Sequence, residues 1–232
     1  MLKMIKDMRQ KRDVVLGRFS KEYIYNVVSN ALRTYKIMFM YFGGSLAYDC
    51  YEDGKSDIDI NVFVDGFNGY IHTSCGDFDL FIYGRDFMMK RQYVDESMCG
   101  YNKIFIDDMC NIDSLLIYMN KEYVKDYEQF VNYDITKSLG KYLEAVYEYF
   151  MFLYVDTEEP LKRFYHIIRI RGQLEDYKKT GKFCTEIPDS FKEEMITFKW
   201  NYDGAIGKKI YRENIGTYLE YIRKVKEELN HV

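Results

Sequence analysis

The sequence has few or none of the features that mark several classes of protein. It has two prolines and three histidines in 232 residues, and no apolar run approaches the roughly 20 residues that span a bilayer. The cysteines are odd in number and form no Cys-x-x-Cys pair, so neither a disulfide framework nor a cysteine–histidine zinc site is predicted. We interpret them as small apolar residues or incidental thiols; they are Cys50, Cys75, Cys99, Cys110 and Cys184.

The composition and charge are those of an ordinary folded protein. Hydrophobic residues make up 47% of the chain and charged residues 30%, which indicates a globular fold and argues against disorder. The formal net charge of −4 does not favour a protein that coats nucleic acid through bulk charge, although it allows a local basic patch. The opening MLKMIKDMRQKRD is too charged for a signal peptide, so we expect a cytoplasmic protein with no membrane partner.

Apolar periodicity predicts mixed helices and strands in the first part of the chain. Residues 3–15 have helical character, and a second helix is predicted to begin after Ser20, a candidate N-cap. Short apolar runs at 37–42, 56–64 and 77–83 are typical of strands, and the segment before the last of them is a loop or hairpin.

From about Ser138 the pattern becomes helical throughout. Three stretches have helical periodicity: 138–154, 160–181 and 214–229. In the second of them, Pro160 stands at a first-turn position and Gly181 at a C-terminal stop. The sequence thus predicts an α+β fold. It has an N-terminal domain, 1–135, with a mixed sheet flanked by helices, and a helical C-terminal domain, 136–232.

Two carboxylates, Asp57 and Asp59, stand in the stretch SDIDINVFV. Residues two apart on a strand point to one face, and Asp79 on the next strand can lie beside them because neighbouring strands are about 4.8 Å apart. Asp77 is an alternative third carboxylate on that face; we prefer Asp79 because the apolar strand continues directly from it. Clustered carboxylates repel one another without a cation, and Mg²⁺ takes such oxygen ligands together with substrate phosphates.

The turn Gly43-Gly44-Ser45 precedes these carboxylates in the chain. Glycines let backbone N–H groups approach a triphosphate, and Ser45 adds a hydroxyl donor. A glycine turn or an Asp-x-Asp on a strand is by itself more often a plain surface feature. The order of strand, glycine turn, short helix, Asp-x-Asp strand and third acidic strand favours a site that holds a metal-bound nucleoside triphosphate.

At these residues the sequence resembles the DNA polymerase beta superfamily of nucleotidyltransferases. Within it, the likeness is to the bacterial and phage "predicted nucleotidyltransferase" family, which includes a branch associated with RNA repair. Three stretches carry the resemblance: GSLAY (44–48) followed by SDIDINVFV, DLFIYGRDFMM (79–89), and FYHIIRIRGQLEDYKKTGKFCTEIP (164–188). Together they touch most of residues 40–190.

The resemblance implies a polymerase-beta-like N-terminal domain and assigns roles to its residues. Gly44 and Ser45 would bind the triphosphate of an NTP such as ATP. Asp57, Asp59 and Asp79 would be the catalytic carboxylates and would hold two Mg²⁺ ions, or Mn²⁺ in their place. Asp79 would also help to deprotonate the attacking hydroxyl.

Two residues of the predicted C-terminal helices complete the candidate set. His166 and Arg169 are three apart on one helix and so share a face. That spacing is equally typical of a helix surface with its own ion pairs. The resemblance implies instead that both side chains face the cleft and bind the nucleotide, since Arg makes good bidentate contacts to phosphate.

The expected activity is transfer of an NMP from an NTP to an acceptor hydroxyl with release of pyrophosphate. The resemblance to the RNA-repair branch favours an RNA 3′ end, in particular one like that of tRNA, as the acceptor. A protein hydroxyl or a small molecule such as an aminoglycoside stays open as the acceptor. A non-catalytic module that binds nucleotide or protein, and a purely structural domain, are the alternatives of another class.

Overall fold

A computed structural model describes residues 11–48, 50–89, 115–132, 160–181, 187–198 and 204–230. The described residues up to 132 belong to one compact unit and those from 160 onward to a second. Each unit has its own fold. None of the helices in these ranges is long and apolar enough to cross a membrane.

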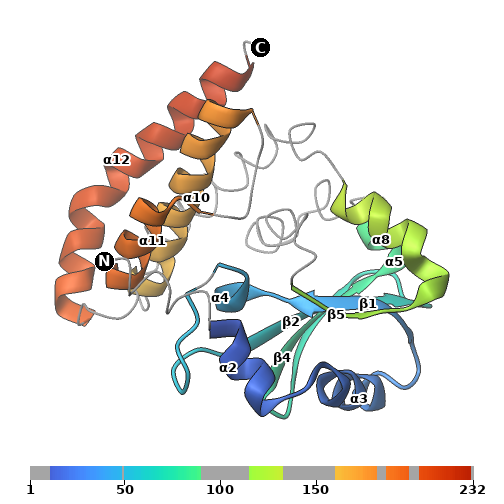
Figure 1. The fold of residues 1–232 in the computed structure, drawn as a ribbon. Coiled ribbons are helices and arrows are strands. Elements are labelled where there is room, and N and C mark those ends of the chain that lie inside the picture. The colour runs from blue at the N-terminus through green and yellow to red at the C-terminus, as the bar shows by residue number, and fades with distance from the viewer. Residues whose placement is uncertain are drawn as a thin grey trace. The chain divides into compact units, whose positions relative to one another are not determined.

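The first unit is built on a five-stranded mixed sheet with helices on both faces (Figure 1). Its strands are β1 (Lys36–Phe42), β2 (Ile58–Asp65), β3 (Tyr70–Cys75), β4 (Phe78–Gly84) and β5 (Leu116–Met119), in the spatial order β3-β4-β2-β1-β5. Its helices are α2 (Lys11–Arg18), α3 (Lys21–Ala31), α4 (Gly44–Ala47), α5 (Arg85–Met89), η2 (Lys121–Tyr123) and α8 (Val124–Val131). The α+β architecture with a mixed, helix-flanked sheet is as the sequence predicts.

The central strands are apolar throughout because the sheet is covered on both faces. Six of the seven residues of β1 are buried, and so are six of the eight residues of β2. On one face Phe39 and Phe63 stack at 4.5 Å between ring centroids and pack against Phe130 of α8. On the other face Phe78 meets Phe19 edge to face, in the linker between α2 and α3.

The start of α3 follows its sequence signal. The Ser20 side chain caps α3 by accepting a hydrogen bond from the Tyr23 N–H at 3.1 Å. Its buried face is formed by Ile24 and Val28, whereas Tyr23 is 49% exposed. The helix predicted over 3–15 begins, within the described residues, at Lys11 and ends at Arg18.

The second unit, in its described part, consists of three helices: α10 (Pro160–Thr180), α11 (Asp189–Ile196) and α12 (Gly204–Asn230). The sequence predicted α10 with its Pro160 start and its stop at Gly181, whose φ is +69°. It did not predict α11, and α12 begins ten residues before the predicted 214–229 stretch. The helix predicted over 138–154 lies outside the described residues.

An arginine joins the three helices of this unit. The Arg171 guanidinium lies over the rings of Phe191, Tyr218 and Tyr221 at 5.6, 5.4 and 5.9 Å from their centroids. The Tyr221 hydroxyl donates to Glu175 at 2.6 Å, and burial, followed by this hydrogen bond, raises the pKa of that tyrosine. The packing of α10 against α11 and α12 thus rests on aromatic and cationic contacts as well as on aliphatic ones.

A tyrosine ties η2 to the carboxyl end of β2 in the first unit. The Tyr123 hydroxyl donates to Asp65 Oδ2 at 2.7 Å, and the Gly66 N–H donates to Asp65 Oδ1 at 2.9 Å. The hydrogen bond from Tyr123 is the main cause that lowers the pKa of Asp65. Lys36 and Arg85 lie over the Tyr123 ring, at 5.4 and 5.7 Å from its centroid.

Replacing this tyrosine is expected to give a pH-dependent loss of stability. A folded-state pKa below the ordinary value of 3.8 means that Asp65 contributes stability above that pH and loses it as the pH falls through the folded pKa. Tyr123→Phe should therefore lower the free energy of unfolding by about 1 kcal/mol at pH 7. Urea denaturation at pH 7, 5 and 3 should show this difference constant down to pH 5 and smaller at pH 3. A difference that is the same at all three pH values would contradict this assignment.

Candidate metal and nucleotide site

Three separate segments of the sequence meet where β1 ends and where β2 and β4 begin. Strands β1 and β2 are antiparallel, so the turn after β1 lies beside the start of β2, and the Gly43 N–H donates to the Asp59 carbonyl at 2.8 Å. Strands β2 and β4 are parallel, so their starts coincide and Asp59 pairs directly with Asp79. The glycine turn, the Asp-x-Asp and the third carboxylate are therefore neighbours, as the order of the motifs predicted.

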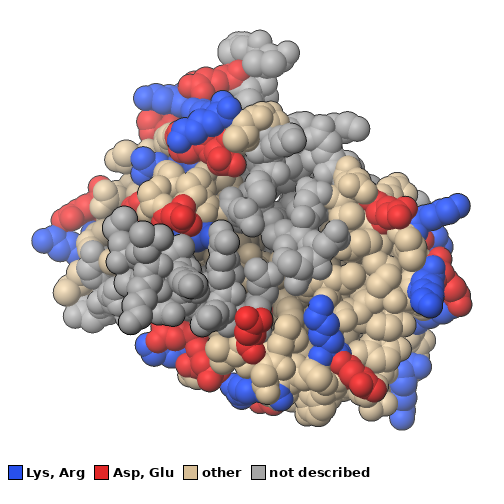
Figure 2. Space-filling model, in the orientation of Figure 1, with Lys and Arg blue, Asp and Glu red and all other residues tan. Residues whose placement is uncertain are grey.

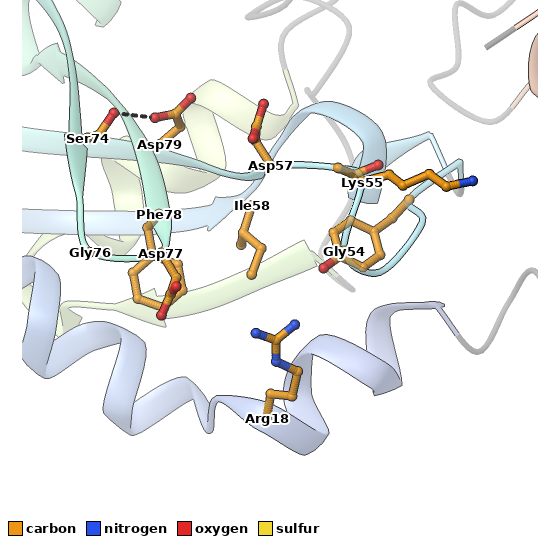
Figure 3. Close-up of a pocket in the computed structure, with 12 residues that line it drawn as sticks. Arg18, Gly54, Lys55, Asp57, Ile58, Ser74, Gly76, Asp77, Phe78 and Asp79 are labelled. Carbon is orange, nitrogen blue, oxygen red and sulfur yellow. Dashed lines mark hydrogen bonds between the residues drawn. The ribbon is translucent and has the colours of Figure 1, made fainter. Parts of the chain in front are cut away.

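The carboxylates share the face that carries the aromatic rings of the core. Because side chains alternate along a strand, Asp59 lies on the same side of β2 as Phe63, and Asp79 on the same side of β4 as Tyr83. The Phe63 and Tyr83 rings stack across the two strands at 5.2 Å. Asp57, one residue before β2, lies on the same side as Asp79 in Figure 3.

Asp77 is placed differently from what the sequence predicted. We expected Asp77 and Asp79 to share a face, as residues two apart on a strand do. Asp77 instead forms the two-residue turn between β3 and β4 together with Gly76, so the alternation of the strand does not extend to it. Figure 3 shows its carboxylate directed to the side of the sheet opposite Asp57 and Asp79, which is the side on which Arg18 lies.

Gly44 lies against the Asp59 carboxylate. Its φ is +50°, and a Cβ built on it would lie 1.6 Å from Asp59 Oδ2, so no other residue fits without a shift of that carboxylate. Ser45, the next residue, is 5% exposed. Both residues belong to the single-turn helix α4, which the sequence predicted as a short helix after the turn. The glycine is therefore required by its contact with Asp59 and not by the turn alone.

A surface pocket of about 400 Å³ opens beside the carboxylates (Figure 3). Asp57, Asp79 and Ser74 line it, and Asp77 lines it from the opposite side of the sheet. Two cations also line it: Arg18, which pairs with Asp53 at 2.7 Å, and Lys55, which pairs with Glu52 at 2.6 Å. The remaining residues around it include Tyr51, Gly54, Ser56, Ile58, Gly76 and Phe78. A volume of this size is within the range of small-molecule sites.

Two residues that the sequence did not predict as part of the site lie next to Asp79. The Ser74 hydroxyl donates to Asp79 Oδ1 at 2.6 Å, and His72 Nε2 lies 3.8 Å from Asp79 Oδ2. Both stand on β3, which pairs antiparallel with β4, and Ser74 is the direct partner of Asp79. Counting back from a two-residue Gly-Asp turn would have placed Ser74 opposite Asp79, because hairpin register is fixed by the length of the turn.

The donor set fits a hard divalent cation in its chemistry. Asp57, Asp59 and Asp79 supply only carboxylate oxygens, which are the ligands that Mg²⁺ takes, and they start adjacent strands on one face. As placed, however, no three acidic, cysteine or histidine side chains in the described residues stand close enough to enclose a metal ion. Within the same ranges, Asp57 is exposed and makes no hydrogen bond or ion pair, so it can reorient at little cost.

Comparisons with known proteins give no family for this chain. No family model and no curated protein matches it.

His166 and Arg169 lie on α10, in the second unit. They are 3% and 0% exposed, so the alternative of a solvated helix surface is wrong for both. They lie in a stretch of α10 that is buried on all sides, since every residue from 165 to 170 is buried. Arg169 Nη1 donates to Gln173 Oε1 at 3.0 Å, one turn further along the helix. That these two side chains bind the nucleotide stays a prediction.

Proposed function

We propose that this protein is a metal-dependent nucleotidyltransferase that moves an NMP from an NTP to an acceptor hydroxyl and releases pyrophosphate. The observation that supports it best is the contact of Gly44 with Asp59, beside the paired Asp79. A backbone turn that can approach phosphates lies within van der Waals distance of the Asp59 carboxylate, and Asp59 pairs with Asp79 across the two strands. A solvated Asp-x-Asp would require no glycine at that position.

In this proposal each residue has a defined task. Gly44 and Ser45 would hold the triphosphate, and Asp57, Asp59 and Asp79 would hold the metal ions. Asp79 lines the pocket. It accepts the proton of the acceptor hydroxyl while the oxygen of that hydroxyl attacks the α-phosphorus. Bound Mg²⁺ supplies charge stabilisation at the phosphate oxygens and at the leaving pyrophosphate. The bond that forms joins the acceptor oxygen to the α-phosphorus. The bond that breaks joins the α-phosphorus to the oxygen of the leaving pyrophosphate.

The acceptor we propose first is an RNA 3′ end, on the resemblance to the RNA-repair branch. On the face that Figure 2 shows, the described basic side chains are interspersed with acidic ones. A long nucleic-acid track on this face is therefore not supported, whereas a single RNA end that enters the pocket is compatible with it. A protein hydroxyl and a small molecule are tested in the same experiment.

The test is transfer of label from each of the four α-³²P-labelled NTPs with Mg²⁺ or Mn²⁺. Total RNA, a protein extract and a panel of small hydroxylated acceptors are offered separately. We expect label to enter the RNA pool with the wild-type chain and not with Asp57→Asn/Asp59→Asn. Label that enters only the protein or the small-molecule pool would change the acceptor, and no label in any pool would overturn the proposed activity.

A non-catalytic nucleotide-binding module is the second candidate. Calorimetric titration of Mg²⁺ with each NTP separates the two candidates when it is combined with the transfer assay. Binding without transfer to any pool supports the module, and binding with transfer supports the enzyme.

A further inference from the structure

The edge strand β3 carries two polar side chains that reach Asp79 from the side away from Asp59. Ser74 and His72 are two residues apart and so share one face of β3. Because Ser74 pairs with Asp79, this is also the face of the sheet on which Asp79 lies. Ser74 donates its hydroxyl hydrogen bond to one carboxylate oxygen of Asp79 at 2.6 Å. The other oxygen lies 3.8 Å from His72 Nε2.

The two side chains are themselves held in place. The His72 ring stacks on Phe81, the direct cross-strand partner of His72, with centroids 4.4 Å apart and planes inclined by 12°. Ser74 lies two residues before the tight turn, where the register of the hairpin is fixed by Cys75 facing Phe78. Rotation of the Asp79 carboxylate therefore breaks a short hydrogen bond, whereas Asp57 has no such restraint among the described residues.

We propose that Ser74, supported by His72, is a positioning residue for the third carboxylate of the site. It fixes the orientation of Asp79 before cation and substrate arrive, so that the exposed Asp57 is the ligand that moves. Ligating carboxylates are commonly oriented by hydrogen bonds of this kind, and removal of such a partner typically weakens metal binding about 10- to 100-fold. The inference rests on the proposed function, because it assigns Asp79 a cation.

The experiment measures Mn²⁺ binding to the full chain by the loss of the free-ion EPR signal, without nucleotide and without turnover. Ser74→Ala is compared with Ser74→Thr, which keeps the hydroxyl and suits a strand. Thr73→Ala is the matched control. It also removes a hydroxyl from an exposed position of β3, but Thr73 pairs with Leu80 and belongs to the other face.

We expect the Mn²⁺ dissociation constant to rise about tenfold in Ser74→Ala, to stay within about twofold of wild type in Ser74→Thr, and to be unchanged in Thr73→Ala. Equal or tighter Mn²⁺ binding by Ser74→Ala would overturn the inference and leave the proposed function standing. Tighter binding would show that Ser74 holds Asp79 away from the metal. A wild-type chain that binds no Mn²⁺ would overturn the proposed function, and this inference with it.

Discussion

A Gly44→Ala variant is expected to lose nucleotidyl transfer by about 100-fold or more. The new methyl group would lie 1.6 Å from Asp59 Oδ2, so either the carboxylate or the turn must shift by an ångström or more. A misplacement of about 1 Å in a catalytic group costs about 100-fold in rate. The positive φ of Gly44 adds a stability loss of about 1–2 kcal/mol. Transfer kinetics and urea denaturation measure the two effects separately.

Gly66→Ala is the matched control for this variant. Gly66 also has a positive φ, +86°, but a Cβ there has no atom within 4 Å, and the residue lies at the opposite end of β2. It should lose a similar amount of stability and keep its transfer rate. If Gly44→Ala transferred label as well as Gly66→Ala does, the contact with Asp59 would have no functional meaning. The site would then have to be placed elsewhere.

Asp79→Asn is expected to lose about 100-fold or more in transfer rate, whereas Asp77→Asn keeps most of it. Asp79 is the residue that shares a face with Asp59, and the charge stabilisation lost with a metal carboxylate is several kcal/mol. A loss of about 3 kcal/mol corresponds to roughly 100-fold in rate. Asp77 lies in the turn, with its carboxylate on the opposite side of the sheet. Single-turnover transfer with saturating NTP is the appropriate measurement.

The pair of variants also decides between the two sequence-based assignments of the third carboxylate. Both remove one negative charge from the same hairpin, so a general electrostatic effect on the pocket would appear in both. A large loss in Asp77→Asn with a small one in Asp79→Asn would contradict the geometry and reverse the assignment. Equal losses would indicate a field effect and not a specific ligand.

Much of the first unit could be predicted from local signals. The strands β1, β2 and β4 are short apolar runs bounded by glycine or acidic residues, and period and length suffice to identify them. The convergence of Gly44, Asp59 and Asp79 also followed, because the motif order left few sheet topologies that bring them together. The burial of both sheet faces explains why β1 lacks alternation.

The features that were missed depend on strand register and on tertiary packing. Ser74 and His72 have no catalytic pattern in the sequence and become meaningful only once β3 pairs with β4. Asp77 was placed on the wrong face because the exact start of β4 decides whether strand alternation applies, and element boundaries are set by the turn. The burial of Arg169 is likewise a tertiary property, since charged residues are seldom fully buried.

Nucleotidyl transfer is distinguished from phosphoryl transfer and from hydrolysis by comparing an NTP labelled at the α-phosphate with the same NTP labelled at the γ-phosphate. Both are incubated with the wild-type chain, Mg²⁺ and the acceptor pool, and the fate of each label is followed. We expect the α-label to enter the acceptor and the γ-label to be released in pyrophosphate. Entry of the γ-label into the acceptor, or hydrolysis with no label in any acceptor, would contradict this expectation.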